Sequence, residues 1–231
     1  KVSEMTADDV KELLLKSGLW AGLVQRPYGI VADPSAEPKA IFVSAFSTAP
    51  LAASPEFALK DDFDNVQAAV NALGKLTRGG VHVSLSIDNF SGSPFHKLEN
   101  VIQHIVSGKH PAGNVGVQIS HISPIMKGET VWTVSLLLLA AIGKLLNTGR
   151  LNLARKVAVT GPKAIDPAYV DALPGISMKD IAEFYDNSAN DIRFISGDVL
   201  TGKNVGPDGS LGFFDNQVTL IHEGTERELL G

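Results

Sequence analysis

The sequence predicts an α/β fold: a Rossmann-like, parallel doubly wound sheet followed by a smaller α+β domain that resembles a β-grasp fold. Two observations lead to this prediction. Apolar, β-branched runs alternate with amphipathic helices as far as Gly149, which is typical of βαβ units. After Leu151 the pattern changes to short strands around one short helix. We therefore expect a Rossmann-like domain over residues 1–150 and a β-grasp domain with a C-terminal strand over residues 151–231.

The first domain is expected to open with a helix and a βαβ unit. Thr6 lies three residues before Asp9, which is an N-terminal capping pattern, and the helix ends at Gly18. Residues 39–46 and 80–87 are apolar enough to be strands buried on both faces. The segment between them, DDFDNVQAAVNALGKLTRGG, has apolar residues at helical spacing and completes the unit.

The next segment, ENVIQHIVSG, allows two interpretations. Its alternation of apolar and polar residues favours a strand, whereas Leu98, Ile102 and Ile105 lie at helical spacing. We interpret it as the third parallel strand. A helix with Pro111 in its first turn is expected to follow, and then a fourth strand over residues 131–135 and a final helix.

The second domain is expected to contain short strands in RKVAVTG, AYVDALPG and DIRFISGDVLTG. Ser177 and Asp180 form another capping pattern, which marks the start of the short helix. The C-terminal segment adds turns and one strand, which we expect to return along the same sheet.

Composition excludes several classes of chemistry. The formal net charge is −5 with no basic run, so a nucleic-acid partner is not expected. The absence of cysteine rules out disulfides, thiolate-bound zinc, cysteine-ligated iron–sulfur clusters and thiol catalysis. The histidines form no metal-binding pair such as HExxH, and no Walker A, GxGxxG or GxSxG pattern occurs. The most apolar run, Leu136–Ile142, is too short for a transmembrane helix.

The segment GLWAGLVQRPYG, between the first helix and the first strand, is the most unusual part of the sequence. Trp20, Leu23, Pro27 and Tyr28 suit an apolar slot lined by aromatic rings. Arg26 and the Tyr28 hydroxyl suit hydrogen-bond donation to the carbonyl oxygen of a planar, neutral ligand with an apolar tail. The alternative is a hydrophobic loop that covers the edge of the sheet.

Two further segments follow predicted strands, where open parallel sheets bind ligands. SAFSTAPLAA follows the first strand, and HPAG, which begins at His110, follows the third. HPAG leads into a helix N-terminus, which favours an anion or a polarised oxygen. The alternative is that Pro111 and Gly113 only shape a tight turn.

Ordered segments along the whole chain carry a resemblance to a known family. They are SGLW and RP in the opening segment, AIFVSAF with STAPLAA, GKHPAG, VW with the helix ending in TGRL, VAVTGP, and IRFISGDVLTG with GPDGSLGFFDNQVTLI. In this order they resemble the A-subunit family of bacterial sodium-translocating NADH:quinone oxidoreductases. The resemblance implies a peripheral subunit, without a transmembrane segment, on the cytoplasmic face of the inner membrane. Its partners would be the other subunits of a six-subunit complex that oxidises NADH, reduces ubiquinone and exports sodium.

The resemblance also implies that this chain corresponds to the middle of a longer subunit, with a Rossmann-like domain followed by a soluble-ligand-binding (SLBB-like) β-grasp domain. A barrel-like domain would precede it and a helical domain would follow. The architecture is also similar to that of the flavin- and NADH-binding subunit of respiratory complex I. In that subunit the equivalent opening loop is rich in glycine, so that the backbone approaches the FMN phosphate. Here Gln25 and Arg26 stand in the loop, and Ser47 and Thr48 stand where that family has acidic residues.

These departures imply that the chain binds neither flavin nor NADH. The absence of cysteine and of metal-binding histidine pairs predicts that it carries no metal or iron–sulfur cluster. The isolated chain is expected not to be catalytic, because flavins and clusters on partner subunits would perform the redox chemistry. Ubiquinone, as substrate, is the expected ligand. Two alternatives stay open, a purely structural adaptor and a degenerate FMN/NADH-binding electron-transfer subunit. The candidate quinone contacts are Trp20, Leu23, Arg26, Pro27, Tyr28, His110 and Pro111.

Overall fold

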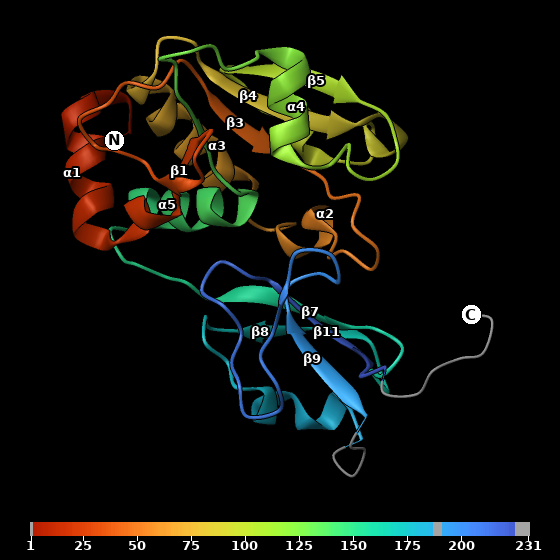
Figure 1. The fold of residues 1–231 in the computed structure, drawn as a ribbon. Coiled ribbons are helices and arrows are strands. Elements are labelled where there is room, and N and C mark those ends of the chain that lie inside the picture. Colours follow the sequence, from red (N-terminus) through yellow and green to blue (C-terminus); the bar gives the residue numbers. More distant parts are fainter. Residues whose placement is uncertain (1, 187–190, 225–231) are drawn as a thin grey trace. The chain divides into compact units, whose positions relative to one another are not determined.

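The structure is a computed structural model that describes residues 2–186 and 191–224, and the chain forms two compact units (Figure 1). The first unit comprises Lys1–Thr48 and Ser54–Asn152, and the second comprises Ala49–Ala53 and Leu153–Gly231. A short segment early in the chain is therefore part of the second unit. The α/β fold class predicted from the sequence is confirmed.

The first unit contains a six-stranded mixed sheet with the strand order β2-β1-β6-β3-β4-β5. Strands β6, β3, β4 and β5 run parallel, as the sequence predicts. Strands β1 and β2 form an antiparallel hairpin that pairs with β6, in a segment that was expected to be a loop. The strands are β1 (Val24–Arg26), β2 (Ile30–Val31), β3 (Ile41–Ser44), β4 (Val81–Ser86), β5 (Val101–Val106) and β6 (Val131–Thr133).

Helices cover both faces of this sheet. Strand β3 is buried on both sides, since Ile41, Phe42 and Val43 are completely inaccessible to solvent. Helix α4 covers one face, where it packs against Phe42 and Val131. Helix α3 makes the crossover from β3 to β4 and packs against α5 on the other face (Figure 1). The helices are α1 (Ala7–Ser17), α2 (Pro55–Ala58), α3 (Phe63–Leu73), α4 (Val115–Ile122) and α5 (Leu136–Thr148).

Local capping signals fix the ends of the long helices. Thr6 and Asp9 form a capping box at the start of α1, which ends at Gly18 in the left-handed conformation with φ of 78°. The Ser135 hydroxyl accepts a hydrogen bond from the backbone N–H of Leu138 at the start of α5. These features confirm the predicted start of the first helix and its end at glycine.

The end of helix α3 differs from the sequence-based expectation. Helix α3 ends at Leu73 and is followed by a 3₁₀ turn, so it is shorter than the apolar spacing suggests. Strand β5 confirms the strand interpretation of ENVIQHIVSG, but its connection from β4 contains 3₁₀ turns and no α-helix. The 3₁₀ segments of this unit are η1 (Val2–Glu4), η2 (Leu19–Gly22), η3 (Gly74–Leu76), η4 (Ile87–Asn89) and η5 (Pro94–Lys97).

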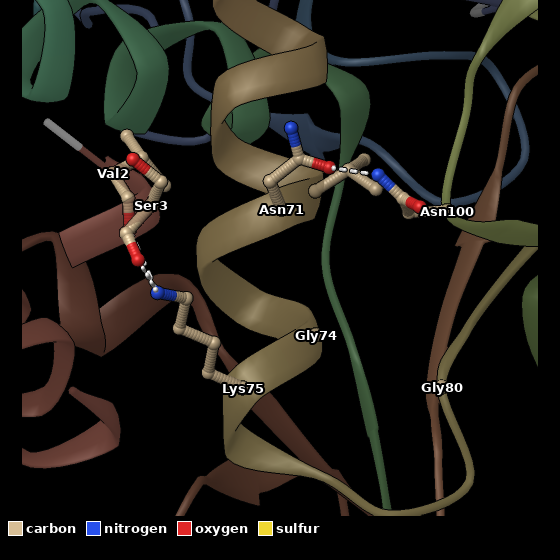
Figure 2. A pocket seen from close by; sticks show the side chains of 8 residues that line it. Val2, Ser3, Asn71, Gly74, Lys75, Gly80 and Asn100 are labelled. Atoms are coloured by element: carbon tan, nitrogen blue, oxygen red, sulfur yellow. Dashed lines mark hydrogen bonds between the residues drawn. The ribbon is translucent and has the colours of Figure 1, made fainter. Parts of the chain in front are cut away.

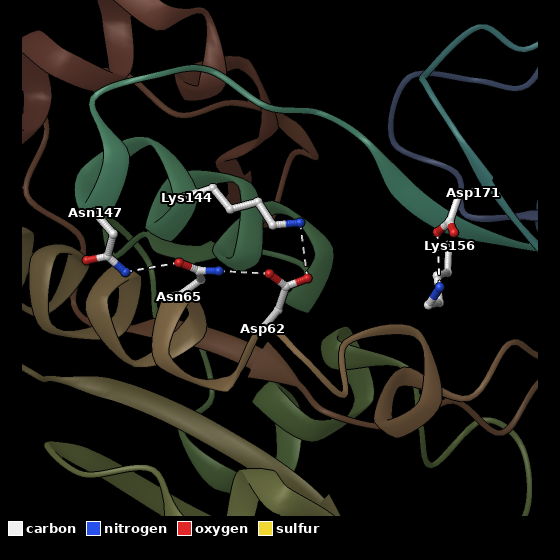
Figure 3. Close-up of polar contacts among 6 residues, drawn as sticks. All are labelled: Asp62, Asn65, Lys144, Asn147, Lys156 and Asp171. Atoms are coloured by element: carbon white, nitrogen blue, oxygen red, sulfur yellow. Dashed lines mark hydrogen bonds and ion pairs between the residues drawn. The ribbon is translucent and has the colours of Figure 1, made fainter.

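Helices α3 and α5 approach each other unusually closely at Gly143. A Cβ atom built on Gly143 would lie 1.8 Å from the backbone oxygen of Asn65. Polar side chains continue the contact along the two helices (Figure 3). The Lys144 ammonium lies 3.1 Å from the Asp62 carboxylate, and Asn65 donates a hydrogen bond of 2.8 Å to the same carboxylate. Asn147 in turn donates to Asn65. The helix pair therefore combines close backbone packing with a half-buried polar network.

The second unit contains a five-stranded mixed sheet with the strand order β10-β9-β11-β7-β8. The C-terminal strand β11 runs parallel to β7 in the middle of the sheet, as expected for a tail that returns along the same unit. Lys156 and Asp171 pair across β7 and β8 at 3.0 Å (Figure 3). The strands are β7 (Arg155–Thr160), β8 (Ala168–Ala172), β9 (Ile192–Ser196), β10 (Lys203–Asn204) and β11 (Gln217–His222).

The predicted short helix of this unit is a 3₁₀ segment, η6 (Met178–Phe184), which begins with the expected capping box. Its residues Met178 and Ile181 are buried against the sheet together with Tyr185. The early segment of the chain is tied to β11, because the backbone N–H of Ala53 donates to the Gln217 side chain at 2.8 Å. Residues 187–190 and 225–231 of the predicted second domain lie outside the described residues.

Candidate functional site

The opening segment adopts regular structure where the sequence suggested a loop. It continues from Gly18 through η2 and forms the β1–β2 hairpin, whose turn is closed by a hydrogen bond of 2.9 Å from the Gly29 N–H to the Gln25 carbonyl. Strand β1 lies between β2 and β6 and pairs with both. Because its backbone is engaged on both sides, β1 has few backbone N–H groups left for a phosphate.

Two of the predicted contact residues are core residues. Trp20 and Leu23 are only 3% and 0% exposed. The Trp20 ring packs edge-to-face against Trp132, and its N–H donates a hydrogen bond of 2.7 Å to the Ala32 carbonyl. The expected aromatic slot is therefore not open at these two positions, because the core of the sheet edge already occupies their side chains.

The other three residues of this segment lie at the surface. Pro27 and Tyr28 are exposed in the hairpin turn, and the Arg26–Pro27 peptide bond is cis. Arg26 is half-buried, and its Nε atom is buried with no hydrogen-bond partner among the described residues. The surface part of the candidate site is thus a half-buried guanidinium, whose Nε atom is not accessible, and an exposed phenol two residues later.

His110 and Pro111 lie near the carboxyl end of the parallel strands. His110 is exposed, and its Nδ1 atom lies 3.3 Å from the Thr48 hydroxyl. That hydroxyl also accepts a hydrogen bond of 3.0 Å from the Gly113 N–H. The loop after β5 is thereby closed onto the segment after β3, so the structure brings together the two segments that their position after predicted strands had singled out.

One expectation for this loop is wrong. Pro111 was expected in the first turn of the following helix, but α4 begins at Val115 with Asn114 as its N-cap. Residues 109–112 form a separate turn, closed by a hydrogen bond from the Ala112 N–H to the Lys109 carbonyl. The His110–Pro111 peptide bond is also cis. Pro111 therefore shapes the turn before the helix.

The hairpin turn and the His110 loop do not form one site. Arg26 is paired with Val131, the first residue of β6, and Val24 is paired with Thr133, the last. The hairpin turn therefore lies beyond the amino end of the parallel strands, whereas the loop that contains His110 follows their carboxyl ends. This corrects the expectation that both segments contact one ligand.

Gln118 is a polar residue at the carboxyl end that sequence reasoning missed. Its side chain is 97% buried, since only 3% is exposed, and its amide nitrogen donates to the Ser44 hydroxyl at 2.9 Å and the Ala112 carbonyl at 3.0 Å. Its Oε1 atom has no partner among the described residues. The sequence contains a signal for this residue, because Gln118 is a polar residue three positions after Val115 on the apolar stripe of the helix.

A cavity of about 440 Å³ opens at the amino end of β4 and β5 (Figure 2). The Asn100 amide donates to the Asn71 side chain at 3.0 Å on one side of it. On the other side, the Lys75 ammonium donates to the backbone carbonyls of η1 and Met5. The Lys75 ammonium therefore binds the backbone of η1. The lining residues are Val2, Ser3, Val70, Asn71, Gly74, Lys75, Gly80 and Asn100.

Comparison with known proteins identifies the family. Residues 5–151 match the family model described as the NqrA second alpha/beta domain, and residues 156–206 match the model described as the NQRA C-terminal domain. The chain belongs to the NqrA family. The family resemblance noted in the sequence is thereby confirmed.

Curated relatives of this NqrA-family chain are named as the A-subunit of Na(+)-translocating NADH-quinone reductase. The relatives from Alcanivorax borkumensis, Histophilus somni (strain 129Pt) and Pseudomonas aeruginosa are 38%, 36% and 36% identical over 236, 232 and 231 residues. Each alignment covers 100% of this chain and 51% of the relative. The chain therefore spans about half the length of the curated relatives it matches.

Solved structures share the NqrA-family fold at low sequence identity. An NAD+-reducing [NiFe]-hydrogenase in the H2-reduced state has a TM-score of 0.60 and 11% identity, covering 93% of this chain and 46% of that chain. The same enzyme in the air-oxidized state has a TM-score of 0.58 and 12% identity, over the same shares. At these identities the likeness shows the fold alone.

Metal-binding groups and membrane-spanning helices are both absent from the described part of this NqrA-family chain. Within residues 2–186 and 191–224, no group of three or more His, Asp or Glu side chains is placed to hold a metal ion. In the same ranges, no helix has the length and apolar character needed to cross a membrane.

Proposed function

We propose that the chain is the central part of the A-subunit of a sodium-translocating NADH:quinone reductase. In this role it binds quinone and contacts the other subunits, and it does not itself transfer electrons. The match of both NqrA family models, in order along the chain, is the observation that carries this proposal. In this proposal it lies at the cytoplasmic face of the inner membrane as a peripheral subunit. Its partners are the other subunits of a six-subunit complex, and its ligand is ubiquinone.

The geometry of β1 supports a ligand other than a nucleotide. A flavin-phosphate loop presents free backbone N–H groups to the phosphate. Here the equivalent segment is a strand paired on both sides, and the Gln25 side chain accepts a hydrogen bond of 3.2 Å from the Asp33 N–H. A phosphate in this position would have to displace strand pairing. We therefore favour a chain without bound flavin or NADH over the degenerate nucleotide-binding alternative.

Arg26 and Tyr28 support a carbonyl ligand at the hairpin turn. Arg26 is half-buried at the end of β1, and its guanidinium offers N–H donors with a positive charge. The Tyr28 side chain is 78% exposed and offers a second donor on an aromatic ring. A quinone head group presents planar carbonyl oxygens, which are acceptors without a charge. Among the seven candidate contacts, we propose that these two bind the quinone, with Pro27 beside them.

The test is an Arg26→Ala, Tyr28→Ala double variant in the full-length protein, assembled into the complex. Loss of a hydrogen bond to a charged donor is worth about 1.5–3 kcal/mol, so we expect the KM for a short-chain ubiquinone to rise by roughly 10-fold to 100-fold. NADH oxidation with an artificial electron acceptor should be unchanged, because no electron carrier is altered.

Arg78→Ala is the matched control. It removes the same charge from a guanidinium that is 92% exposed and paired with Glu37. Its KM should stay at the wild-type value. An unchanged KM in the double variant would favour the purely structural adaptor, and flavin absorbance of the purified chain would favour the nucleotide-binding alternative.

A further inference from the structure

His82 and His104 lie side by side on neighbouring strands of the first sheet. The Nδ1 atom of His82 in β4 lies 2.9 Å from the Nε2 atom of His104 in β5. The ring planes are within 11° of each other and the ring centres are 5.1 Å apart. The centres are separated by the nitrogen–nitrogen distance plus nearly two ring radii. The rings therefore meet edge to edge, as in a straight hydrogen bond.

The neighbouring groups determine the tautomers of the two rings. The Nε2 atom of His82 lies 3.2 Å from the Gly79 carbonyl, which can only accept, so this nitrogen carries the proton. The Nδ1 atom of His82 then has a lone pair and accepts a hydrogen bond from the Nε2–H of His104. In the neutral pair, the Nδ1 atom of His104 is consequently the one ring nitrogen with a lone pair that is not used within the pair.

The surroundings of the pair contain little competing charge. His82 stacks on Phe42, whose ring centre is 4.5 Å away, and both histidines are half-buried. Among β3, β4, β5 and α4, which form or cover this face, the only other titratable residue is His121, which is exposed. Only His104 adds an electrostatic contribution at His82. The adjoining turns carry further charged residues: Lys75, Arg78, Asp88, His96, Lys97 and Glu99.

We propose that His82 and His104 form a proton-sharing couple that binds one proton through the Nδ1 atom of His104 and excludes a second. The first proton converts the bond between the rings into a charge-assisted hydrogen bond, along which the cation can be shared. A second proton would place two cations against each other at hydrogen-bond distance. The hydrogen bond between the rings thus links edge strand β5 to β4 when the couple is neutral or singly protonated. It breaks when the couple is doubly protonated.

Burial determines how the couple affects stability as pH falls. Burial lowers the pKa of both histidines from the ordinary value, and His104 lowers the pKa of His82 further. Below about pH 6.5 the unfolded chain therefore binds more protons than the folded chain. Stability contributed by the neutral pair is complete above that pH and decreases as pH falls through 6.5 towards the lowered pKa values. Urea unfolding of the chain at about pH 7.5 and about pH 5.5 measures this decrease.

NMR titration of the imidazole nitrogens in the full chain tests the couple directly. At high pH both rings should carry their proton on Nε2. In the first acid step the signals of both rings should move together, each by about half of the full change to imidazolium, because they share one proton. The second half should follow only at distinctly lower pH.

Two variants separate this behaviour from a merely structural contact. In His104→Gln the side-chain amide can still donate to His82, so we expect an intact fold and a single, full titration step at His82. The control His121→Gln should leave the shared first step unchanged. Independent full titration of the two rings, or a proton on the Nδ1 atom of either ring at high pH, would overturn the proposal. The wild-type spectra decide the matter even if His104→Gln does not fold.

Discussion

Replacing Gly143 by alanine is expected to lower the free energy of unfolding by roughly 3 kcal/mol, a typical upper cost of overpacking a well-packed core. In an open helix the same change stabilises by about 1 kcal/mol, because alanine has the higher helix propensity. Here the new Cβ atom would lie 1.8 Å from the Asn65 backbone oxygen and 2.5 Å from its Cα atom. Neither backbone atom can turn away as a flexible side chain would, so α3 and α5 must separate.

Urea unfolding followed by tryptophan fluorescence measures this effect in the correct unit. The chain has two tryptophans, Trp20 and Trp132, and both belong to the first unit. Gly116→Ala in α4 is the matched control, because a Cβ atom at Gly116 would meet no other atom within 4 Å. We expect that control to be neutral or stabilising by up to about 1 kcal/mol. Equal stability of the two variants would contradict the close packing of α3 against α5.

Replacing Trp20 by alanine is expected to cost about 4 kcal/mol of unfolding free energy. The substitution removes a buried ring that packs on Trp132, and a buried aromatic replaced by alanine costs about 3–5 kcal/mol. It also leaves the Ala32 carbonyl without the hydrogen bond that the indole N–H donates. The remaining Trp132 reports the transition by fluorescence.

Tyr28→Ala is the control for this second prediction. Tyr28 lies in the same hairpin but is 78% exposed, so its removal should change stability by less than about 0.5 kcal/mol. The two variants thus distinguish a candidate residue that stabilises the fold, Trp20, from one that is accessible to a ligand, Tyr28. A small loss of stability for Trp20→Ala would mean that Trp20 is available for a ligand after all.

Periodicity predicts much of the fold because the signals are local. Apolar spacing predicts the four parallel strands, and the helices capped by Thr6 and Ser135 add capping signals that lie within a few residues. The β1–β2 hairpin lacks such a signal. Its strands are only three and two residues long, and pairing with β6, more than 100 residues later, is what makes β1 a strand.

The candidate site could be predicted only in part for a similar reason. Sequence position after a strand predicts that the loops at Thr48 and His110 lie at one edge, because parallel strands share a carboxyl edge, and the two loops are in contact there. In the opening segment, the closeness of the residues in sequence did not show which side chains point into the core. Trp20 and Leu23 turn into the core, while Tyr28 points to solvent, and this depends on packing against Trp132 on a distant strand.

Photoaffinity labelling of the assembled complex with a photoreactive short-chain ubiquinone, followed by peptide mapping, tests directly whether the hairpin turn binds quinone. We expect the label on this chain to concentrate in residues 24–31, which contain Arg26 and Tyr28, and excess unlabelled ubiquinone to remove it. We also expect that the Arg26→Ala, Tyr28→Ala variant loses this label while Arg78→Ala retains it. Label that bypasses residues 24–31, or that persists in the double variant, would contradict the proposed quinone contact.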